Sequence, residues 1–133
     1  MSVIDLGTTE SYGFGKDPIV IRKYIAGIIG GKVLDADGFT ENEIKAGHII
    51  IRSVVSGEKE TYKPLGVSNG NYVSLPENHE YAGVAVATVP VTEPIVGIMY
   101  NGEVNDVASP FPVNATLKAA LKVSLPTLTF LHD

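Results

Sequence analysis

The sequence predicts a mainly β protein: a compact β-barrel-like domain with one or two short helices and a flexible N-terminal arm. The 133 residues include 14 glycines and 8 prolines, which indicates many turns and short strands. Short segments rich in Val, Ile or Leu alternate with those turns. A chain of this length is expected to bury one hydrophobic core and to fold as a single domain.

Composition narrows the classes of function. Ten Lys and Arg residues against fifteen Asp and Glu residues give a formal charge of -5, and the basic residues form no cluster, so we expect no nucleic-acid partner. The chain has no cysteine, which excludes disulfides and thiolate metal sites. The N-terminus lacks the basic start and apolar core of a secretory signal, and no apolar run approaches the ~20 residues of a membrane span. We therefore expect a protein made in the cytoplasm, without a membrane partner.

Residues 1–17 are predicted to form the flexible arm, and residues 18–133 the folded domain. The arm is polar and rich in glycine, but it also carries the isolated aromatic residues Tyr12 and Phe14. Apolar anchors of this kind suit an arm that docks on a partner, and the alternative is a terminus that folds back on its own core. Residues 18–25 follow with a leading proline, β-branched residues and a basic pair, a pattern that favours an edge strand.

The next segment is predicted to bend repeatedly. Bends in the sheet are expected at Gly27, Gly30 and Gly31. A phosphate loop is not expected there, because the segment lacks the Lys-Ser or Lys-Thr ending of that motif. Residues 35–38, Asp-Ala-Asp-Gly, predict a turn, because the closing position of a calcium loop would be Ala46 instead of Glu. Thr40, with Glu43 three residues later, resembles a capping box and predicts one helical turn through residue 45.

A hairpin and a loop are expected next. Residues 48–55 and 60–65 have strand composition and are joined by a Ser-Gly-Glu-Lys turn, which predicts a β-hairpin. Residues 66–79 are rich in Asn, Ser and Gly, and they predict a surface loop with a short strand at most.

The centre of the core is predicted in residues 81–107. Two runs rich in Val and Ile are separated by a connection that Pro90 and Pro94 bracket, because proline cannot continue a ladder of hydrogen bonds. Small Gly and Ala residues alternate with Val in the first run, so both of its faces should be covered. Asn101 and Gly102 tolerate positive φ, and we expect a tight reversal there.

The C-terminal part is predicted to be a helix followed by a closing strand. Asn114 can cap a helix over residues 115–123, in which Leu117 and Leu121 share the buried face. Pro126 ends the helix, and residues 128–131 form the last strand.

The candidate chemical groups do not form a recognisable site. The three histidines, spaced without any metal-ligand pattern, are expected to be ordinary surface or strand-end residues: His48, His79 and His132. Three carboxylates flank the core strands and are expected to be solvated, although two of them meeting across a cleft could act as acid and base: Glu93, Glu103 and Asp106. We therefore predict no catalytic, cofactor-binding or metal site, and no enzyme activity.

Several segments together resemble the lambda-type bacteriophage head decoration proteins. They are residues 42–51 (Asn-Glu-Ile-Lys-Ala-Gly-His-Ile-Ile-Ile), 62–65 (Tyr-Lys-Pro-Leu), 81–86 (Tyr-Ala-Gly-Val-Ala-Val) and 96–105 (Val-Gly-Ile-Met-Tyr-Asn-Gly-Glu-Val-Asn). The short helix and closing strand are similar to the ends of such proteins from phages and prophages of gut bacteria. The resemblance covers residues 18–131, and the chain departs from the compact lambda form by extra length at residues 32–45 and 66–79.

This resemblance implies a β-tulip-like domain that assembles as a homotrimer on the outside of a phage capsid. Its function would be mechanical: it would clamp neighbouring major capsid protein subunits and stabilise the expanded shell of the virion. The resemblance also implies that the N-terminal arm adds to capsid strands. The implied capsid-contact candidates are Tyr12, Phe14, Ile19 and Val20.

Two other functions remain open from the sequence. One is another phage structural part, such as a fibre or tail module, which would assemble as an elongated or intertwined stalk. The other is a small ligand-binding β-barrel domain or enzyme, which needs a pocket lined by aromatic residues and converging polar groups. The chain has no Trp, so few large aromatic side chains are present to stack on a sugar ring.

Overall fold

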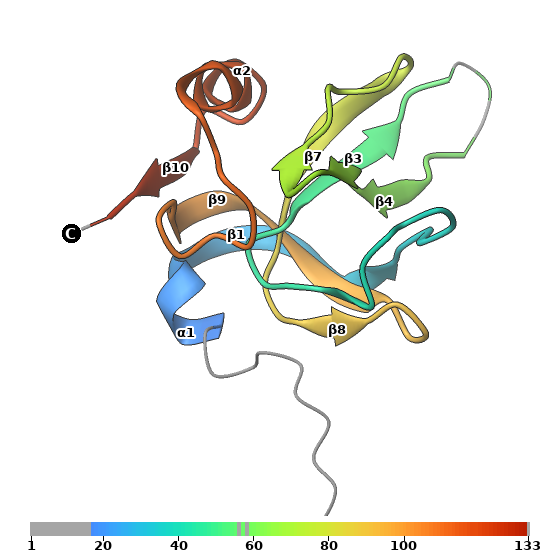
Figure 1. The fold of residues 1–133 in the computed structure, drawn as a ribbon, viewed down its shortest axis with the longest axis horizontal. Helices are drawn as coiled ribbons and strands as arrows, with labels where there is room; N and C mark the ends of the chain where they lie inside the picture. The colour runs from blue at the N-terminus through green and yellow to red at the C-terminus, as the bar shows by residue number, and fades with distance from the viewer. Residues whose placement is uncertain (1–16, 56, 58, 133) are drawn as a thin grey trace, which may run out of the picture.

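The computed structural model describes residues 17–55, 57 and 59–132, so nearly all of the predicted arm lies outside the described residues. The described chain is mainly β, as predicted, with antiparallel sheets and little helix (Figure 1). Its elements are α1 (Asp17–Val20), β1 (Ile21–Val33), β2 (Glu43–Ile44), β3 (Ile49–Ser53), β4 (Tyr62–Pro64), β5 (Val67–Ser68), β6 (Asn71–Tyr72), β7 (His79–Ala85), β8 (Val89–Pro90), β9 (Ile95–Asn105), α2 (Ala115–Ser124) and β10 (Leu128–Leu131).

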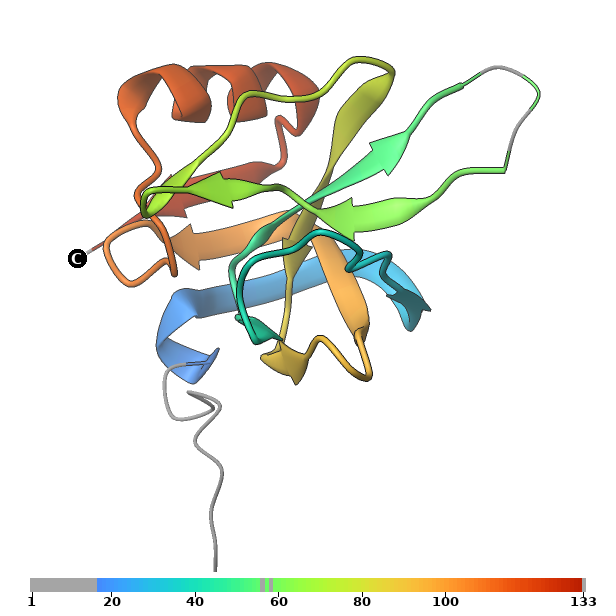
Figure 2. The same cartoon turned by 45° about the vertical axis from the view of Figure 1, so that its right-hand side comes forward.

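Strand β9 is the central element of the main sheet. The strand order is β1-β9-β7-β3-β4, and β10 pairs with β9 in parallel. One edge of β9 is occupied along its length by β1, and its other edge is shared by β7 and β10 (Figure 2). Within the described residues, β1 and β4 each have one strand neighbour in this sheet, so the sheet is open and does not close into a barrel.

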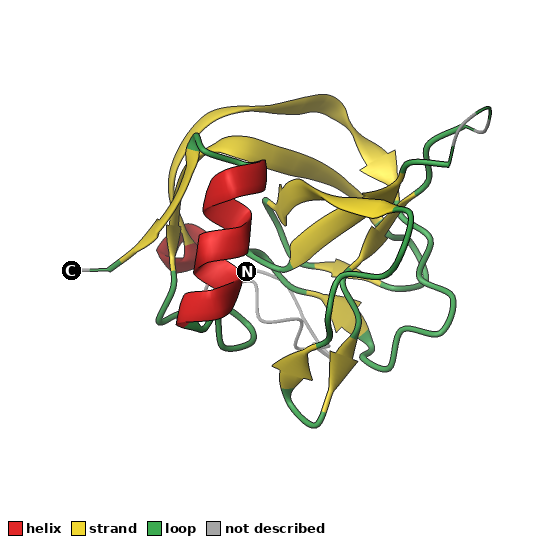
Figure 3. Cartoon of the chain, turned by 90° about the horizontal axis from the view of Figure 1, so that it is seen from above, coloured by secondary structure: helices red, strands yellow, loops and turns green. Residues whose placement is uncertain are grey.

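The predicted core strand pair is confirmed. Strand β7 pairs with β9 through Val84 and Met99, and its residues 81–85 are all buried. Neighbouring residues of one strand enter different clusters: Val84 and Met99 belong to the larger cluster, whereas Ala85 and Ile98 belong to the smaller one. This alternation places one cluster on each face of the sheet. Helix α2 covers the face of the larger cluster through the buried Leu121 (Figure 3).

The predicted reversal at Asn101 and Gly102 is wrong, because β9 continues through both residues to Asn105. Gly102 has a φ of 153°, and a Cβ at this position would collide with the carbonyl oxygen of Lys23 in β1. The glycine is therefore needed for the close approach of two backbones rather than for a turn.

The predicted helical turn at residues 40–45 is also wrong. Glu43 and Ile44 form β2, which pairs with β8, and the side chain of Ile44 is fully buried. Burial of a β-branched residue in a sheet outweighs the weak local preference of a capping box.

The predicted edge strand exists, but its limits differ. Pro18 lies in the short helix α1, where the first turn tolerates proline, and β1 begins at Ile21. The strand then runs through all three glycines to Val33, with a register shift between Ile28 and Lys32. Gly30 and Gly31, with φ values of 83° and 75°, allow that irregularity.

Most of the remaining local predictions are confirmed. Strands β3 and β4 form an antiparallel hairpin, and β5 and β6 form a small hairpin inside the expected loop. The Asn114 side chain accepts a hydrogen bond of 2.8 Å from the Leu117 backbone N–H and so caps α2. Strand β10 closes the chain as expected.

Candidate functional site

The largest run of exposed apolar side chains follows β1 and β9. We call this surface the β1–β9 ribbon, and define it by five residues whose side chains are 41% to 69% exposed: Tyr24, Ile25, Val33, Ile95 and Tyr100. They lie on two strands that are paired along their length, and Val33 and Ile95 are direct partners in the register. Large apolar side chains that are exposed along one pair of strands are candidates for contact with another molecule.

The ribbon also contains an open sheet edge. Strand β1 pairs only with β9 among the described residues, so the other side of its backbone has no strand partner there. Such edges are where extended segments of other chains add to a sheet. Basic side chains at Arg22, Lys23 and Lys32, together with four register shifts, limit unspecific pairing at this edge.

The four predicted capsid-contact candidates have different positions. Tyr12 and Phe14 lie outside the described residues. Ile19, in α1, is 55% exposed, and it precedes the ribbon directly. Val20 is only 3% exposed and belongs to the core, where its side chain fills the space beside Gly47. Ile19 is therefore free to meet a partner, whereas Val20 attaches α1 to its own domain.

The three carboxylates do not form a catalytic pair. Glu103 faces Arg22, with 3.7 Å between carboxylate oxygen and guanidinium Nε, and Glu93 is exposed. Asp106 is bound by two basic side chains, and its own side chain is only 8% exposed. Lys118 lowers the pKa of this carboxyl, with a smaller contribution from His132. The described part of the chain holds no group of three or more acidic or histidine side chains that could bind a metal ion.

His48 is not an ordinary strand-end residue. It is 1% exposed, and its Nε2 lies 2.8 Å from the carbonyl oxygen of Leu65. Because a carbonyl oxygen can only accept, Nε2 carries the hydrogen of the neutral ring. The ring packs in T-shaped geometry against three aromatic rings at centroid distances of 5.1 to 5.7 Å: Phe39, Tyr72 and Phe111.

Burial lowers the pKa of His48 to about 4, and the hydrogen bond to Leu65 opposes the shift only in part. The histidine is therefore a neutral core residue that packs the start of β3 against strand β6 and two loops. The three isoleucines after it could have indicated a buried strand, but the aromatic partners come from distant segments and leave no local pattern.

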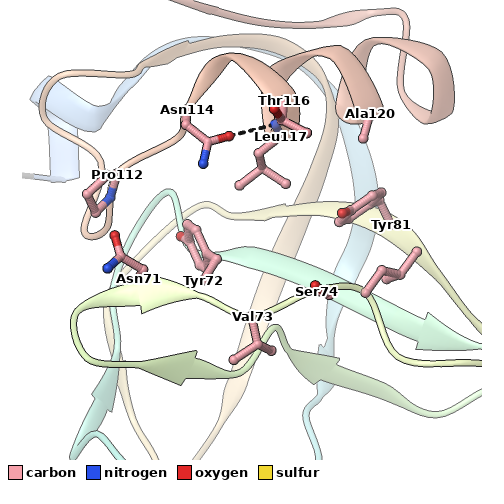
Figure 4. A pocket seen from close by; sticks show the side chains of 11 residues that line it. Asn71, Tyr72, Val73, Ser74, Tyr81, Pro112, Asn114, Thr116, Leu117 and Ala120 are labelled. Atoms are coloured by element: carbon pink, nitrogen blue, oxygen red, sulfur yellow. Dashed lines mark hydrogen bonds between the residues drawn. The ribbon is translucent and has the colours of Figure 1, made fainter.

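A hollow of about 270 Å³ lies between α2 and the β5–β6 hairpin (Figure 4). Tyr81 points its ring and hydroxyl toward the centre, while Leu117 and Ala120 of α2 form the apolar wall. The lining contains no charged side chain: Asn71, Tyr72, Val73, Ser74, Leu75, Tyr81, Pro112, Asn114, Thr116, Leu117 and Ala120. The hollow can hold a neutral group, but it supplies no acid, base or nucleophile pair.

Comparison of the chain with protein-family models, with curated proteins and with solved structures gave no significant match. In the described residues, no helix has the length and apolar character needed to cross a membrane. Because no matching protein supplies a function, any inference of function depends on three features of the structure: the open β1–β9 ribbon, the exposed Ile19 beside it, and the uncharged hollow under α2.

Proposed function

We propose that this protein is a structural virion component that binds the outside of a phage capsid as a homotrimer and stabilises the expanded shell. The observation that carries the proposal is the β1–β9 ribbon. An exposed apolar edge strand begins directly after the N-terminal segment and is bonded along its length to the central strand of the sheet. Such a surface suits binding to other protein chains, whereas the described residues offer no catalytic constellation.

In this proposal the major capsid protein is the partner, and the N-terminal segment makes the contact. Tyr12, Phe14 and Ile19 would fill pockets between capsid strands, while the backbone of the segment adds hydrogen bonds to them. Three segments on one trimer would bind together far more tightly than one, because the first contact raises the effective concentration of the others. A β-tulip-like domain is the fold that this function implies for the chain.

Removal of residues 1–16 tests the assignment. The truncated chain is expected to keep its circular dichroism spectrum and its mass by light scattering, and to lose co-elution with purified expanded capsids. The full chain is the positive control, and unexpanded capsids are a control for the shell state. Unchanged capsid binding by the truncated chain would show that the N-terminal segment is not the clamp.

The hollow under α2 favours one alternative, a small ligand-binding domain. Its uncharged lining and the inward hydroxyl of Tyr81 would suit a neutral ligand with one polar group. A monomer that ignores capsids but is stabilised against heat by a neutral compound would support this alternative. An elongated or intertwined assembly would instead indicate a fibre or tail part.

A further inference from the structure

The sequence contains two Asn-Gly pairs, and the structure places them in opposite surroundings. Asn69 and Gly70 form the exposed turn between β5 and β6. Asn101 and Gly102 lie inside β9, where Asn101 pairs with Ala26 of β1 and Gly102 is buried. An asparagine that precedes glycine is chemically labile, because glycine has no side chain to shield its backbone nitrogen from the neighbouring amide.

The turn at Asn69 leaves that nitrogen open. The φ angles are 54° at Asn69 and 76° at Gly70, as in a two-residue hairpin turn of type I′. A Cβ built on Gly70 would meet no atom within 4 Å in the part of the chain that the structure describes. The Gly70 N–H also donates no hydrogen bond to any described residue. The nitrogen is therefore free to react with the side chain that precedes it.

The second pair is protected by the sheet. The Gly102 N–H donates a hydrogen bond of 3.2 Å to the carbonyl oxygen of Thr127. A Cβ at Gly102 would collide with the carbonyl oxygen of Lys23, so the backbone of β1 lies directly against this glycine. Reaction at Asn101 requires β9 to separate from its neighbours, and such an opening of the central strand is rare in the folded state. The same dipeptide at Asn101 is thus an internal control for the effect of the fold.

We propose that Asn69 is a site of spontaneous deamidation. A base in solution removes the proton of the Gly70 amide, the nitrogen attacks Cγ of Asn69, and the bond from Cγ to Nδ2 breaks. Nδ2 takes up a proton and leaves as ammonia, while the backbone nitrogen and Cγ close a succinimide ring. Water then opens the ring at one of its two carbonyl groups and gives either aspartate or isoaspartate. Each event adds one negative charge to a chain whose formal charge is -5.

The two products affect the hairpin differently. Aspartate tolerates the left-handed φ of Asn69 about as well as asparagine does, so the turn persists. Isoaspartate adds a carbon atom to the main chain of a short turn in which Ser68 pairs with Asn71. Asn71 and Val73 line the hollow under α2, so this product changes one wall of the hollow. The Val73 N–H, bonded at 2.9 Å to the carbonyl oxygen of Gly66, reports on that change.

Incubation of the full chain at body temperature in mildly alkaline buffer, followed by peptide mass spectrometry, tests the proposal. Chymotrypsin separates the two pairs by cleavage after the tyrosines between them. The Asn69 peptide is expected to gain about one dalton at least about tenfold faster than the Asn101 peptide. In urea the two rates should agree within about twofold, because both pairs then have the same local chemistry.

Variants assign the product to one side chain. Asn69→Gln is expected to abolish the earliest acidic form on ion exchange, because glutamine would have to close a larger ring. Asn78→Gln is the matched control: Asn78 is also exposed, with a φ of 58°, but His79 follows it, so the acidic form should persist. Asn69→Asp provides the reference for the aspartate product. The isoaspartate form, separated from that reference, should exchange the Val73 amide faster.

Three results would overturn the inference. Equal rates at Asn69 and Asn101 in the folded chain would mean that the fold does not select the site. An Asn69 that reacts only in urea would mean that the turn blocks the attack. An acidic form that persists in Asn69→Gln would assign the charge change to another residue. None of these measurements involves a capsid, so their outcome is independent of the proposed function.

Discussion

The buried His48 predicts that acid destabilises this protein well above the pKa range of its carboxylates. In the folded state the pKa of the ring is about 4, whereas an unfolded chain restores it to about 6.5. The folded-state pKa is depressed, so the unfolded chain binds more protons between these two values. The stabilisation is therefore fully present above about pH 6.5 and is lost as the pH falls toward 4.

The size of the loss in unfolding free energy follows from the shift in the pKa of His48. A difference of roughly 2.5 pKa units at 1.36 kcal/mol each corresponds to about 3 kcal/mol of unfolding free energy. That is a large part of the stability of an ordinary domain, about 5 to 15 kcal/mol. Below about pH 4 the folded ring is also protonated, and this contribution becomes constant.

Urea unfolding of wild type and His48→Gln, followed by circular dichroism between about pH 7.5 and 3, measures the effect. Glutamine does not titrate, and its amide N–H can replace Nε2 as the donor to Leu65. The variant is expected to be less stable at neutral pH because its side chain fits the aromatic pocket less well. Its pH dependence should nevertheless be smaller than that of wild type by about 3 kcal/mol over this range.

The comparison isolates one histidine, because His79 and His132 are present in both proteins and their contributions cancel. Equal pH dependence in the two proteins would refute the reasoning: it would mean that the ring is not neutral in the folded state or that the pocket opens at little cost. A loss confined to the region below about pH 4 would point to carboxylates instead.

Two further predictions concern the strands β9 and β10. Gly102→Ala is expected to lower the free energy of unfolding in urea by more than about 2 kcal/mol, because the new Cβ meets the backbone of β1. Gly38→Ala is the control, since Gly38 also has a positive φ but lies in open space, and it should lower the free energy of unfolding by only about 1 kcal/mol. Similar losses for both would contradict the proposed close approach. Asp106→Asn removes the ion pair with Lys118 and changes the hydrogen bond with His132, and it is expected to speed hydrogen exchange of the β10 amides about two- to fivefold. Unchanged exchange would mean that these contacts do not hold the C-terminal strand.

The sequence predicted most accurately the elements that are determined by residues close together in the chain. The Asn114 cap, the leucines that follow it and the later proline define a helix without help from the rest of the chain. The β3–β4 hairpin similarly joins two β-branched runs across a glycine-containing turn.

The failed predictions have a common physical cause. A residue pattern that favours a turn or a cap was outweighed by a partner far along the chain. A glycine is needed at position 102 because β1, about 80 residues earlier in the chain, approaches it closely. Ile44 lies in a strand instead of the predicted helical turn because it pairs with β8. The spacing of residues along the sequence does not indicate these distant partners.

The candidate site was only partly accessible to sequence reasoning. Ile19 and Val20 are adjacent and similar in chemistry, and the sequence treats them alike. The short helix α1 separates them by turning one side chain outward and the other into the core. The β1–β9 ribbon was also not predictable, since it depends on the register that makes Val33 and Ile95 partners across 62 positions.

The pairing of β1 with β9 gives the proposed clamp a mechanical basis. Tension on the N-terminal segment would enter the domain at α1, which the buried Val20 attaches to the core, and would then act along β1. Because β1 and β9 are antiparallel and bonded from Ile21 to Val33, such tension loads many hydrogen bonds together instead of opening them one by one. On its other edge, β9 is bonded to β7 and β10, so the load spreads into the buried centre of the sheet. In the proposed function, an arm attached in this way would transmit load from the capsid without unfolding the domain that carries it.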